Sequence, residues 1–388
     1  MATDITSDLL DESVIEAIDM VPIGAALPPG HGYGSVREIA RRRAATLVFV
    51  RTRAGVTGVG ESFGPPETTL AYLDMLRANY LGRALLDHRA IWREMTNRMY
   101  HVRARSQLGA AISGLDIAIH DALGRLTGVP VYRLLGGAPC ESLPVYASGG
   151  YYNEPEAADL ASQMERVAGQ YGAYKIKIGS GPADDEKRVA LSRSIVGEDA
   201  DLMVDINGAY TADVALESMN RIARHNPYWV EEPLAPEDLP GYRRLAGRTP
   251  LRIASGEAAI TAPEFVELSE TGSVDLLMPD LNLCGGFVEG MRVADYAHLA
   301  GLRVSPHVWG GAVGLVAAMH YVAAMPVHPH VDADMVPTYV EYDVSDNPIA
   351  DALLTETPAP VDGRLAMPAG PGLGIEIDPD ALKRLRLD

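Results

Sequence analysis

From about residue 143 onward, short hydrophobic runs alternate with longer stretches in which apolar residues recur at helical spacing. Continuous apolar runs are typical of strands buried on both faces, and the stretches between them are typical of amphipathic helices. Eight such runs occur, at 143–148, 174–178, 202–206, 228–232, 251–255, 275–280, 302–308 and 338–343. Eight strands with helical connections predict an α/β fold, a parallel (β/α)8 barrel of the TIM type. An open doubly wound sheet is the alternative, and polar residues at nearly every strand end favour the barrel.

The first part of the chain follows a different pattern. Residues 44–62 contain two apolar runs on either side of a turn, which predicts a β-hairpin, and residues 106–128 carry small and apolar residues at helical spacing. We therefore expect residues 1–140 to form a small α+β domain and residues 141–359 to form the barrel. The last segment, 360–388, follows the eighth strand and is expected to pack back on the first domain.

Composition narrows the classes of protein that fit. The chain has 388 residues and a net charge of −19, which disfavours binding to nucleic acid or to an anionic membrane surface. No apolar stretch approaches the ~20 residues of a membrane span, and the acidic first residues do not resemble a secretory signal. The two cysteines, Cys140 and Cys284, are expected to be reduced thiols, so we expect a cytoplasmic enzyme. A homo-oligomer is also expected.

Polar side chains stand at the carboxyl ends of the predicted strands, where barrel enzymes build their active sites. They are Lys175, Lys177, Asp205, Asn207, Glu231, Glu257, Asp280, His307 and Glu341. From Asp205 to His307, such positions recur every 23 to 27 residues, which is one strand–helix unit each time. We therefore expect these side chains to lie at similar depths on successive strands.

Three of these residues, Asp205, Glu231 and Glu257, are carboxylates on consecutive strands. Three anions close together need a cation, and a ligand set of oxygen atoms alone suits Mg²⁺. Each carboxylate could instead cap a helix or pair with an arginine, but three at a constant interval favour a metal site. The sequence therefore predicts that these three residues bind Mg²⁺.

Two candidate bases accompany the carboxylates. Lys175 and Lys177 are two residues apart on one strand, so their side chains point to one face. A second ammonium and a divalent cation nearby would lower the pKa of Lys177 and let it act as a general base, whereas a solvated lysine pair is the alternative. On the seventh strand, His307 can donate its Nδ1–H to Asp280, which would fix the tautomer of the ring. Lys177 and His307 are then placed to transfer protons on opposite faces of one carbon, with Glu341 hydrogen-bonded to the enolate oxygen.

The motifs at these positions resemble those of the enolase superfamily and, within it, the mandelate racemase subgroup. They are KIKIG (175–179), DIN (205–207), WVEEP (229–233), GE (256–257), MPD (278–280), SPH (305–307) and EYD (341–343), supported by 113–137 and 371–377. The muconate lactonizing subgroup usually has a lysine on the sixth strand in place of the histidine, and DLNLCGG (280–286) has none. More narrowly, the chain resembles galactarolactone cycloisomerases and neighbouring acid-sugar dehydratases.

The resemblance implies an N-terminal capping domain over a modified barrel, with Mg²⁺ on the three carboxylates. It implies Lys177 as the base on one face of the substrate and His307, oriented by Asp280, on the other. It also implies a capping-domain loop that closes over the substrate, which we place within residues 25–35; an ordinary surface loop is the alternative. Candidate substrate contacts are His31, Tyr33, Asn207 and Trp309, with Arg103 and Arg105 for a distal carboxylate, and Asp332 or Asp334 could replace Glu341.

The expected substrate is a small carboxylate, either a sugar acid or its lactone. The expected reaction removes the α-proton to give an enediolate and then expels a β-hydroxyl, which makes an acid-sugar dehydratase the first interpretation. Two alternatives share the first step: ring opening of a galactarolactone by β-elimination, and 1,1-proton transfer in a racemase or epimerase. A non-catalytic protein that binds sugar acids is the remote alternative, and the full set of acid, base and ligand residues argues against it.

Overall fold

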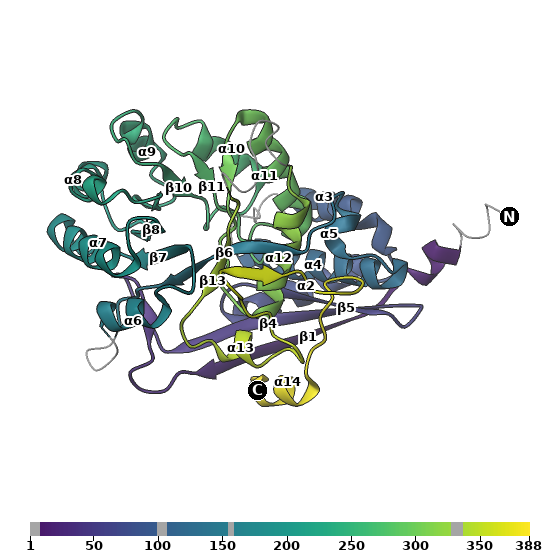
Figure 1. The fold of residues 1–388 in the computed structure, drawn as a ribbon. Helices are drawn as coiled ribbons and strands as arrows, with labels where there is room; N and C mark the ends of the chain where they lie inside the picture. The colour runs from purple at the N-terminus through teal and green to yellow at the C-terminus, as the bar shows by residue number, and fades with distance from the viewer. Residues whose placement is uncertain (1–7, 99–106, 154–158, 327–336) are drawn as a thin grey trace.

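An antiparallel sheet with helices on one face forms the N-terminal part of the molecule (Figure 1). The computed structural model describes residues 8–98, 107–153, 159–326 and 337–388. The sheet has the order β1-β4-β5, and the predicted hairpin at 44–62 is confirmed as β4 and β5. The elements are β1 (Ile15–Ala26), β2 (Tyr33–Gly34), β3 (Ile39–Ala40), β4 (Arg42–Thr52), β5 (Thr57–Ser62), α2 (Pro66–Tyr80), η1 (Leu85–Asp87), α3 (His88–Arg98), α4 (Gln107–Thr127) and α5 (Val131–Leu134).

A curled parallel sheet forms the second part, and all eight predicted strands are confirmed in it (Figure 1). They are β6 (Ser142–Gly149), β7 (Ala173–Lys177), β8 (Asp201–Asp205), β9 (Val230–Glu231), β10 (Ile253–Ser255), β11 (Leu276–Leu277), β12 (Arg303–Val304) and β13 (Val340–Asp343). Their order is β12-β11-β10-β9-β8-β7-β6-β13, and β14 (Arg364–Ala366) adds to β6 in the antiparallel sense. Between β12 and β13, Ser305 Oγ donates to the carbonyl of Tyr339 over 3.0 Å. The fold is the expected modified TIM-type barrel with an α+β N-terminal capping domain.

Helices connect successive strands and cover the outside of the sheet (Figure 1). They are α6 (Leu160–Val167), α7 (Pro182–Val196), α8 (Ala212–Ile222), η2 (Ala223–His225), α9 (Leu239–Leu245), α10 (Ala262–Ser269), α11 (Gly286–Ala300) and α12 (Ala312–Ala324). Two short helices, α13 (Pro348–Asp351) and α14 (Pro379–Leu385), follow β13 and contact the N-terminal sheet. Helix α12 is buried almost all round because it packs against β5 of the first sheet as well as against β6 and β13. Within the described ranges, no helix combines the length and the apolar character that crossing a bilayer requires.

The inside of the barrel is filled by an apolar layer that lies beneath the polar strand ends. The layer consists of Tyr146, Ala173, Met203, Trp229, Ala254, Leu276, Met278 and Tyr339, all of them buried. Because side chains alternate along a strand, the residue two positions further on points to the same interior face. Five members of the layer are each followed, two positions later, by a residue of the polar cluster. The pairs are Ala173 and Lys175, Met203 and Asp205, Trp229 and Glu231, Met278 and Asp280, and Tyr339 and Glu341. The polar cluster therefore lies next to a buried apolar layer at the ends of the same strands.

The C-terminal segment contacts the N-terminal sheet. Leu387 N donates to the carbonyl of Pro22 over 2.9 Å, and Ile23 forms a bridge with Arg386. Further along, Leu373 N donates to Asp121 of α4 over 2.8 Å. The division into a domain of residues 1–140 and a barrel of residues 141–359 stays a prediction.

Candidate active site

Three carboxylates meet at the carboxyl ends of neighbouring strands. Asp205 ends β8, Glu231 ends β9, and Glu257 follows β10 after Gly256. One oxygen atom of each lies within 4.8 Å of the others, which is close enough for a single metal ion to bind all three. The regular spacing along the chain therefore does bring these side chains together, as expected.

The local charge balance fits a cation at this place. Glu232, next to Glu231, is also buried, and Glu232 Oε1 and Glu257 Oε2 have no hydrogen-bond partner among the described residues. Burial and the neighbouring carboxylates raise the pKa of Glu231 to about 8, even though Lys175 opposes the shift. Burial and the same carboxylates also raise the pKa of Glu232. Four crowded acidic groups with orphaned oxygen atoms and no thiol or imidazole among them suit a hard divalent cation.

The two lysines make ion pairs with these carboxylates. Lys175 is completely buried, and its Nζ lies 2.7 Å from Glu231 Oε1 and 2.8 Å from Glu341 Oε1. Lys177 Nζ contacts Asp205 Oδ2. The two lysines are thus on one face of β7, as predicted, but each has acidic partners of its own.

The sequence predicts that Lys175 and a bound divalent cation lower the pKa of Lys177, and for the cation-bound site this stays a prediction. Burial does favour the neutral amine, and Lys175 adds to that effect. The negative charges of Asp205, Glu257 and Glu231 outweigh both, so the pKa of Lys177 is raised. Asp205, which Lys177 contacts directly, contributes most to this rise, and the spacing of the two lysines does not reveal that contact.

The predicted His307–Asp280 pair is present on the other side of the carboxylates. His307 Nδ1 lies 2.8 Å from Asp280 Oδ2, and His307 Nε2 lies 3.5 Å from Glu257 Oε2. Burial disfavours the imidazolium, but Glu257, Asp280 and Glu341 outweigh it and raise the pKa of His307 to about 10. A histidine that carries its proton at neutral pH can donate that proton to a leaving group.

Glu341 pairs with Lys175 and also lies within the influence of His307 and Lys177. Besides its ion pair with Lys175, its Oε2 accepts the backbone N–H of Val308 over 3.1 Å. Burial alone would raise the pKa of Glu341, but Lys175, His307 and Lys177 hold it below its ordinary value. Asp332 and Asp334, the proposed substitutes for Glu341, lie outside the described residues, as do Arg103 and Arg105.

Aromatic side chains stand above the two candidate bases. Lys177 Nζ lies 5.8 Å from the ring centre of Trp309 and 6.0 Å from that of Tyr151, and the His307 ring stacks on Trp309 at 6.3 Å. Tyr33, from the predicted loop, packs on Trp309 and Tyr151 with ring centres 5.2 and 5.8 Å apart. Two predicted substrate contacts, Tyr33 and Trp309, are therefore next to the site.

The other two predicted substrate contacts, Asn207 and His31, differ in how close they lie to the carboxylates. Asn207 Nδ2 lies 3.5 Å from Glu257 Oε1, at the edge of the carboxylate group. His31 is about half exposed and pairs with Asp346, which lies after β13, so it stands apart from the buried polar cluster. That His31 contacts substrate stays a prediction.

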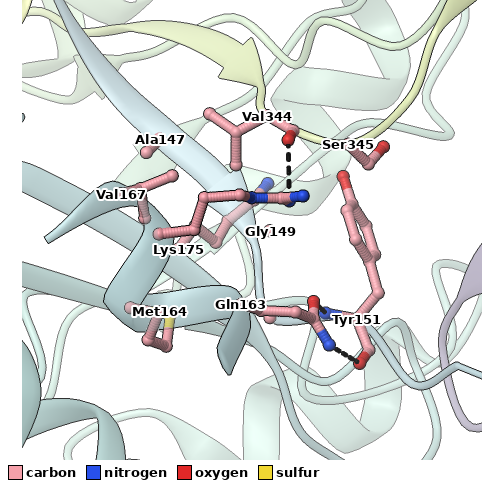
Figure 2. Close-up of a pocket in the computed structure, with 11 residues that line it drawn as sticks. Ala147, Gly149, Tyr151, Gln163, Met164, Val167, Lys175, Val344 and Ser345 are labelled. Atoms are coloured by element: carbon pink, nitrogen blue, oxygen red, sulfur yellow. Dashed lines mark hydrogen bonds between the residues drawn. The ribbon is translucent and has the colours of Figure 1, made fainter. Parts of the chain in front are cut away.

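Sequence reasoning missed Tyr151 and Arg43. Tyr151 follows the first barrel strand, and the run SGGYY after that apolar strand is the sequence signal for it. Figure 2 shows how Gln163 of α6 holds it: Tyr151 N donates to Gln163 Oε1 over 2.9 Å, and Gln163 Nε2 donates to the Tyr151 carbonyl over 3.2 Å. Arg43 of β4 is buried, its guanidinium lies 3.4 Å from the Tyr33 ring centre, and it pairs with Asp343 over 2.6 Å.

A separate cavity lies at the other end of the barrel strands. It has a volume of about 620 Å³ and lies near the amino ends of β6 and β12, with Cys140, Leu143, Arg303 and Tyr339 in its lining. None of the candidate acid, base or ligand residues lines it. Barrel enzymes carry out their chemistry at the opposite end of the strands. The cluster of Asp205, Glu231 and Glu257 therefore remains the candidate site.

The comparisons with known proteins agree with this architecture. Residues 35–136 match the mandelate racemase/muconate lactonizing enzyme N-terminal domain, and residues 156–381 match the family described as enolase C-terminal domain-like. D-galactarolactone cycloisomerase of Agrobacterium fabrum is 37% identical over 349 residues, which are 89% of this chain and 92% of that protein. Arabinonate dehydratase of Saccharolobus solfataricus is 29% identical over 336 residues, 84% of this chain and 87% of that protein.

A solved structure has the same fold over nearly the whole chain. The crystal structure of a racemase from Streptomyces coelicolor with bound magnesium has a TM-score of 0.85 and 28% identity, and the match covers 96% of this chain and 100% of that one. The polar strand ends, the curled sheet and both domain matches point to one conclusion. The chain is an enzyme that belongs to the mandelate racemase subgroup of the enolase superfamily.

Proposed function

We propose that this enzyme is Mg²⁺-dependent and removes the α-proton of a sugar acid or sugar-acid lactone, then eliminates an oxygen substituent from the β-carbon. One observation carries the proposal: Lys177 and His307 reach the carboxylate group from opposite sides, at Asp205 and at Glu257 respectively. Asp205, Glu231 and Glu257 would hold the cation. Bound there, Mg²⁺ would offset the negative charge that develops on the substrate carboxylate.

Lys177 must be neutral to act as the base, and a cation bound at Asp205, Glu231 and Glu257 would offset the charges that favour its ammonium form. In the proposed reaction, neutral Lys177 takes the α-proton on Nζ, and the C–H electron pair moves into the carboxylate to give an enediolate. The pair then returns to form a C=C bond while the bond from the β-carbon to oxygen breaks. His307 donates its Nε2 proton to the departing oxygen, and Asp280 holds the ring through Nδ1. The product is an enol, which becomes the 2-keto acid when a proton moves to carbon. No oxidant or reductant is needed.

The leaving group distinguishes two forms of the reaction. If a free hydroxyl leaves, the enzyme is an acid-sugar dehydratase, which is the first interpretation from the sequence and the activity named for the arabinonate relative. If the ring oxygen of a lactone leaves, the enzyme is a cycloisomerase. The relative named D-galactarolactone cycloisomerase has the higher identity, 37% against 29%, and favours this second candidate.

The aromatic group formed by Tyr33, Tyr151 and Trp309 supports a carbohydrate-derived substrate. These rings stand over both candidate bases and form an apolar wall that can pack against the C–H faces of a sugar. Arg43, embedded between Tyr33 and Trp309, pairs with Asp343, so it holds the aromatic group in place.

The test is an activity screen with the full chain and Mg²⁺. Monoacid sugars, diacid sugars and their lactones would be incubated in D₂O and followed by proton NMR, with a carbonyl reagent to detect keto acids. We expect deuterium in the product and a new keto acid from at least one compound. Epimerisation without loss of oxygen would support the racemase alternative. Absence of both α-proton exchange and keto-acid formation in every compound would overturn the proposal.

A further inference from the structure

A carboxylate of the N-terminal sheet reaches into the active-site end of the barrel. Glu61 lies near the end of β5, and its side chain is completely buried. Glu61 Oε1 accepts the backbone N–H of Gly311 over 2.5 Å and the side-chain Nδ2–H of Asn282 over 3.1 Å. Glu61 Oε2 accepts the backbone N–H of Gly314 over 3.1 Å. All three contacts are donors to the carboxylate, so the group is matched as an acceptor.

These contacts hold together the two loops that carry Asp280 and His307. Asn282 is two residues after Asp280, and its backbone N–H donates to Asp280 Oδ1 over 2.8 Å. Gly311 is four residues after His307, and both lie in the loop between β12 and α12. One carboxylate thus fastens both segments at once, and a continuous hydrogen-bonded path runs from Glu61 through Asn282 and Asp280 to the ring of His307.

Small residues make this approach possible. A Cβ atom on Gly310 would lie 2.3 Å from Glu61 Oε1, and one on Gly311 would lie 2.8 Å from Glu61 Oε2. A Cβ atom on Gly314 would lie 2.1 Å from Asn282 Nδ2. Real Cβ atoms do not come so close to other atoms, so any side chain here would push Glu61 or Asn282 away. The loop after His307 is shaped around this carboxylate.

We propose that Glu61 is a positioning residue, supplied by the capping domain, that sets the orientation of the Asp280–His307 pair. The consequence for the reaction rests on the proposed role of His307 as the proton donor to the leaving oxygen. Glu61 touches neither the carboxylate group nor Lys177 in the structure, so it acts on one of the two proton transfers. A second effect is structural, because Glu61 also accepts N–H groups of the first turn of α12, whose N-cap Gly311 has no side-chain acceptor.

The test compares the isosteric substitution Glu61→Gln with a matched control, Asp121→Asn. Asp121 is likewise a fully buried carboxylate of the N-terminal domain, and it accepts the backbone N–H of Val59 and of Leu373, both over 2.8 Å. Its path does not lead to His307. The readout is the pair of ring-nitrogen chemical shifts of His307, in protein labelled with nitrogen-15 histidine and assigned by their absence in His307→Asn.

We expect Glu61→Gln to move the His307 ring-nitrogen shifts and Asp121→Asn to leave them unchanged, although both substitutions lower stability. With a substrate in hand, Glu61→Gln should reduce kcat for elimination at least tenfold while α-proton exchange by Lys177 changes less than threefold. If Glu61→Gln fails to fold, Asn282→Ala removes the same link and should move the same shifts. Unchanged His307 shifts in a folded Glu61→Gln or Asn282→Ala protein would overturn the proposal. The shifts are read without substrate, so failure of the proposed reaction is a separate outcome.

Discussion

Lys177 and Asp205 are register partners on adjacent parallel strands, and the ammonium of Lys177 contacts the carboxylate of Asp205. This contact places the proposed base beside a proposed metal ligand. Asp205, together with Glu257 and Glu231, raises the pKa of Lys177, although burial and Lys175 oppose the rise.

Mg²⁺ should stabilise the fold through the three carboxylates. Without a cation, Glu231 and its neighbours repel one another, so a bound divalent ion removes an unfavourable term. At a Mg²⁺ concentration of 100 times Kd, binding to the native state alone adds about 2.7 kcal/mol. The measurement is thermal unfolding with Mg²⁺ and with a chelator. Glu257→Gln should abolish the rise in Tm, whereas Glu376→Gln, at an exposed position, should keep it. An equal rise in the Glu257→Gln protein would contradict the assignment.

His307→Asn should separate the two halves of the reaction. The substitution removes the proton donor to the leaving oxygen and leaves Lys177 in place. We expect elimination to slow by about 10²–10⁴-fold, the usual contribution of a general acid, with exchange of the substrate α-proton largely retained. The two rates are measured on the same sample in D₂O by proton NMR. His225→Asn, on the outer surface of the barrel, serves as the control. Equal loss of exchange and elimination would show that His307 is not confined to the second step.

Lys175→Met should destabilise the protein. Lys175 is completely buried between Glu231 and Glu341, and removing it leaves two buried carboxylates without their cation. Breaking one side of a buried ion pair costs about 3–5 kcal/mol. Urea unfolding in the presence of a chelator measures this loss. Adding Glu341→Gln to Lys175→Met should recover part of it, because one unpaired charge is then removed. Lys383→Met, at an exposed position on α14, should have no comparable effect, and an undiminished stability of Lys175→Met would refute the argument.

Glu61 gives a pH dependence of stability with a definite sign. Burial raises the pKa of Glu61 to about 7, against the lowering by the N–H groups of Gly311 and Gly314, and the charge of Asp280, which faces it, adds to the rise. The raised pKa means that the native state holds this proton more tightly than the unfolded state does. The contribution of Glu61 is therefore fully present below its unfolded pKa and is lost as pH rises through about 7.

Glu61→Gln removes this dependence. Relative to wild type, the variant should become more stable by about 2–3 kcal/mol between about pH 5 and about pH 8, whatever constant loss its changed hydrogen bonds cause. Urea unfolding at a series of pH values measures the difference. A pH-independent difference between the two proteins would show that Glu61 titrates normally in the native state.

The sequence was most informative where a local pattern carries the structure. Eight apolar runs predicted the eight strands, and the constant interval between acidic residues predicted the group of Asp205, Glu231 and Glu257. Strand lengths were overestimated, because β9 has two paired residues where five apolar or acidic positions suggested a full strand. Apolar residues indicate which positions are buried. Fewer positions than these form the backbone hydrogen bonds that define a strand.

Contacts between distant segments could not be predicted in the same way. Arg43 and Glu61 come from strands of the N-terminal sheet, and no periodicity links them to the ends of β11 and β12. The state of Lys177 depends on which side chain its ammonium meets, which the spacing of two lysines does not determine. Long-range packing and the sum of nearby charges decided these features, and both need the folded chain.

The most direct test of the central claim measures α-proton exchange by Lys177→Met. The wild-type protein, with Mg²⁺ and a sugar acid or lactone that it turns over in D₂O, should incorporate deuterium at the α-carbon of the remaining substrate, because a deuteron can return to the enediolate before elimination. Lys177→Met should lose that incorporation by about 10²–10⁴-fold while it still binds the substrate, because the proposed general base on that face is gone. Lys187→Met, which changes an exposed lysine on α7, should exchange like wild type. Deuterium incorporation at the wild-type rate in Lys177→Met would contradict the account.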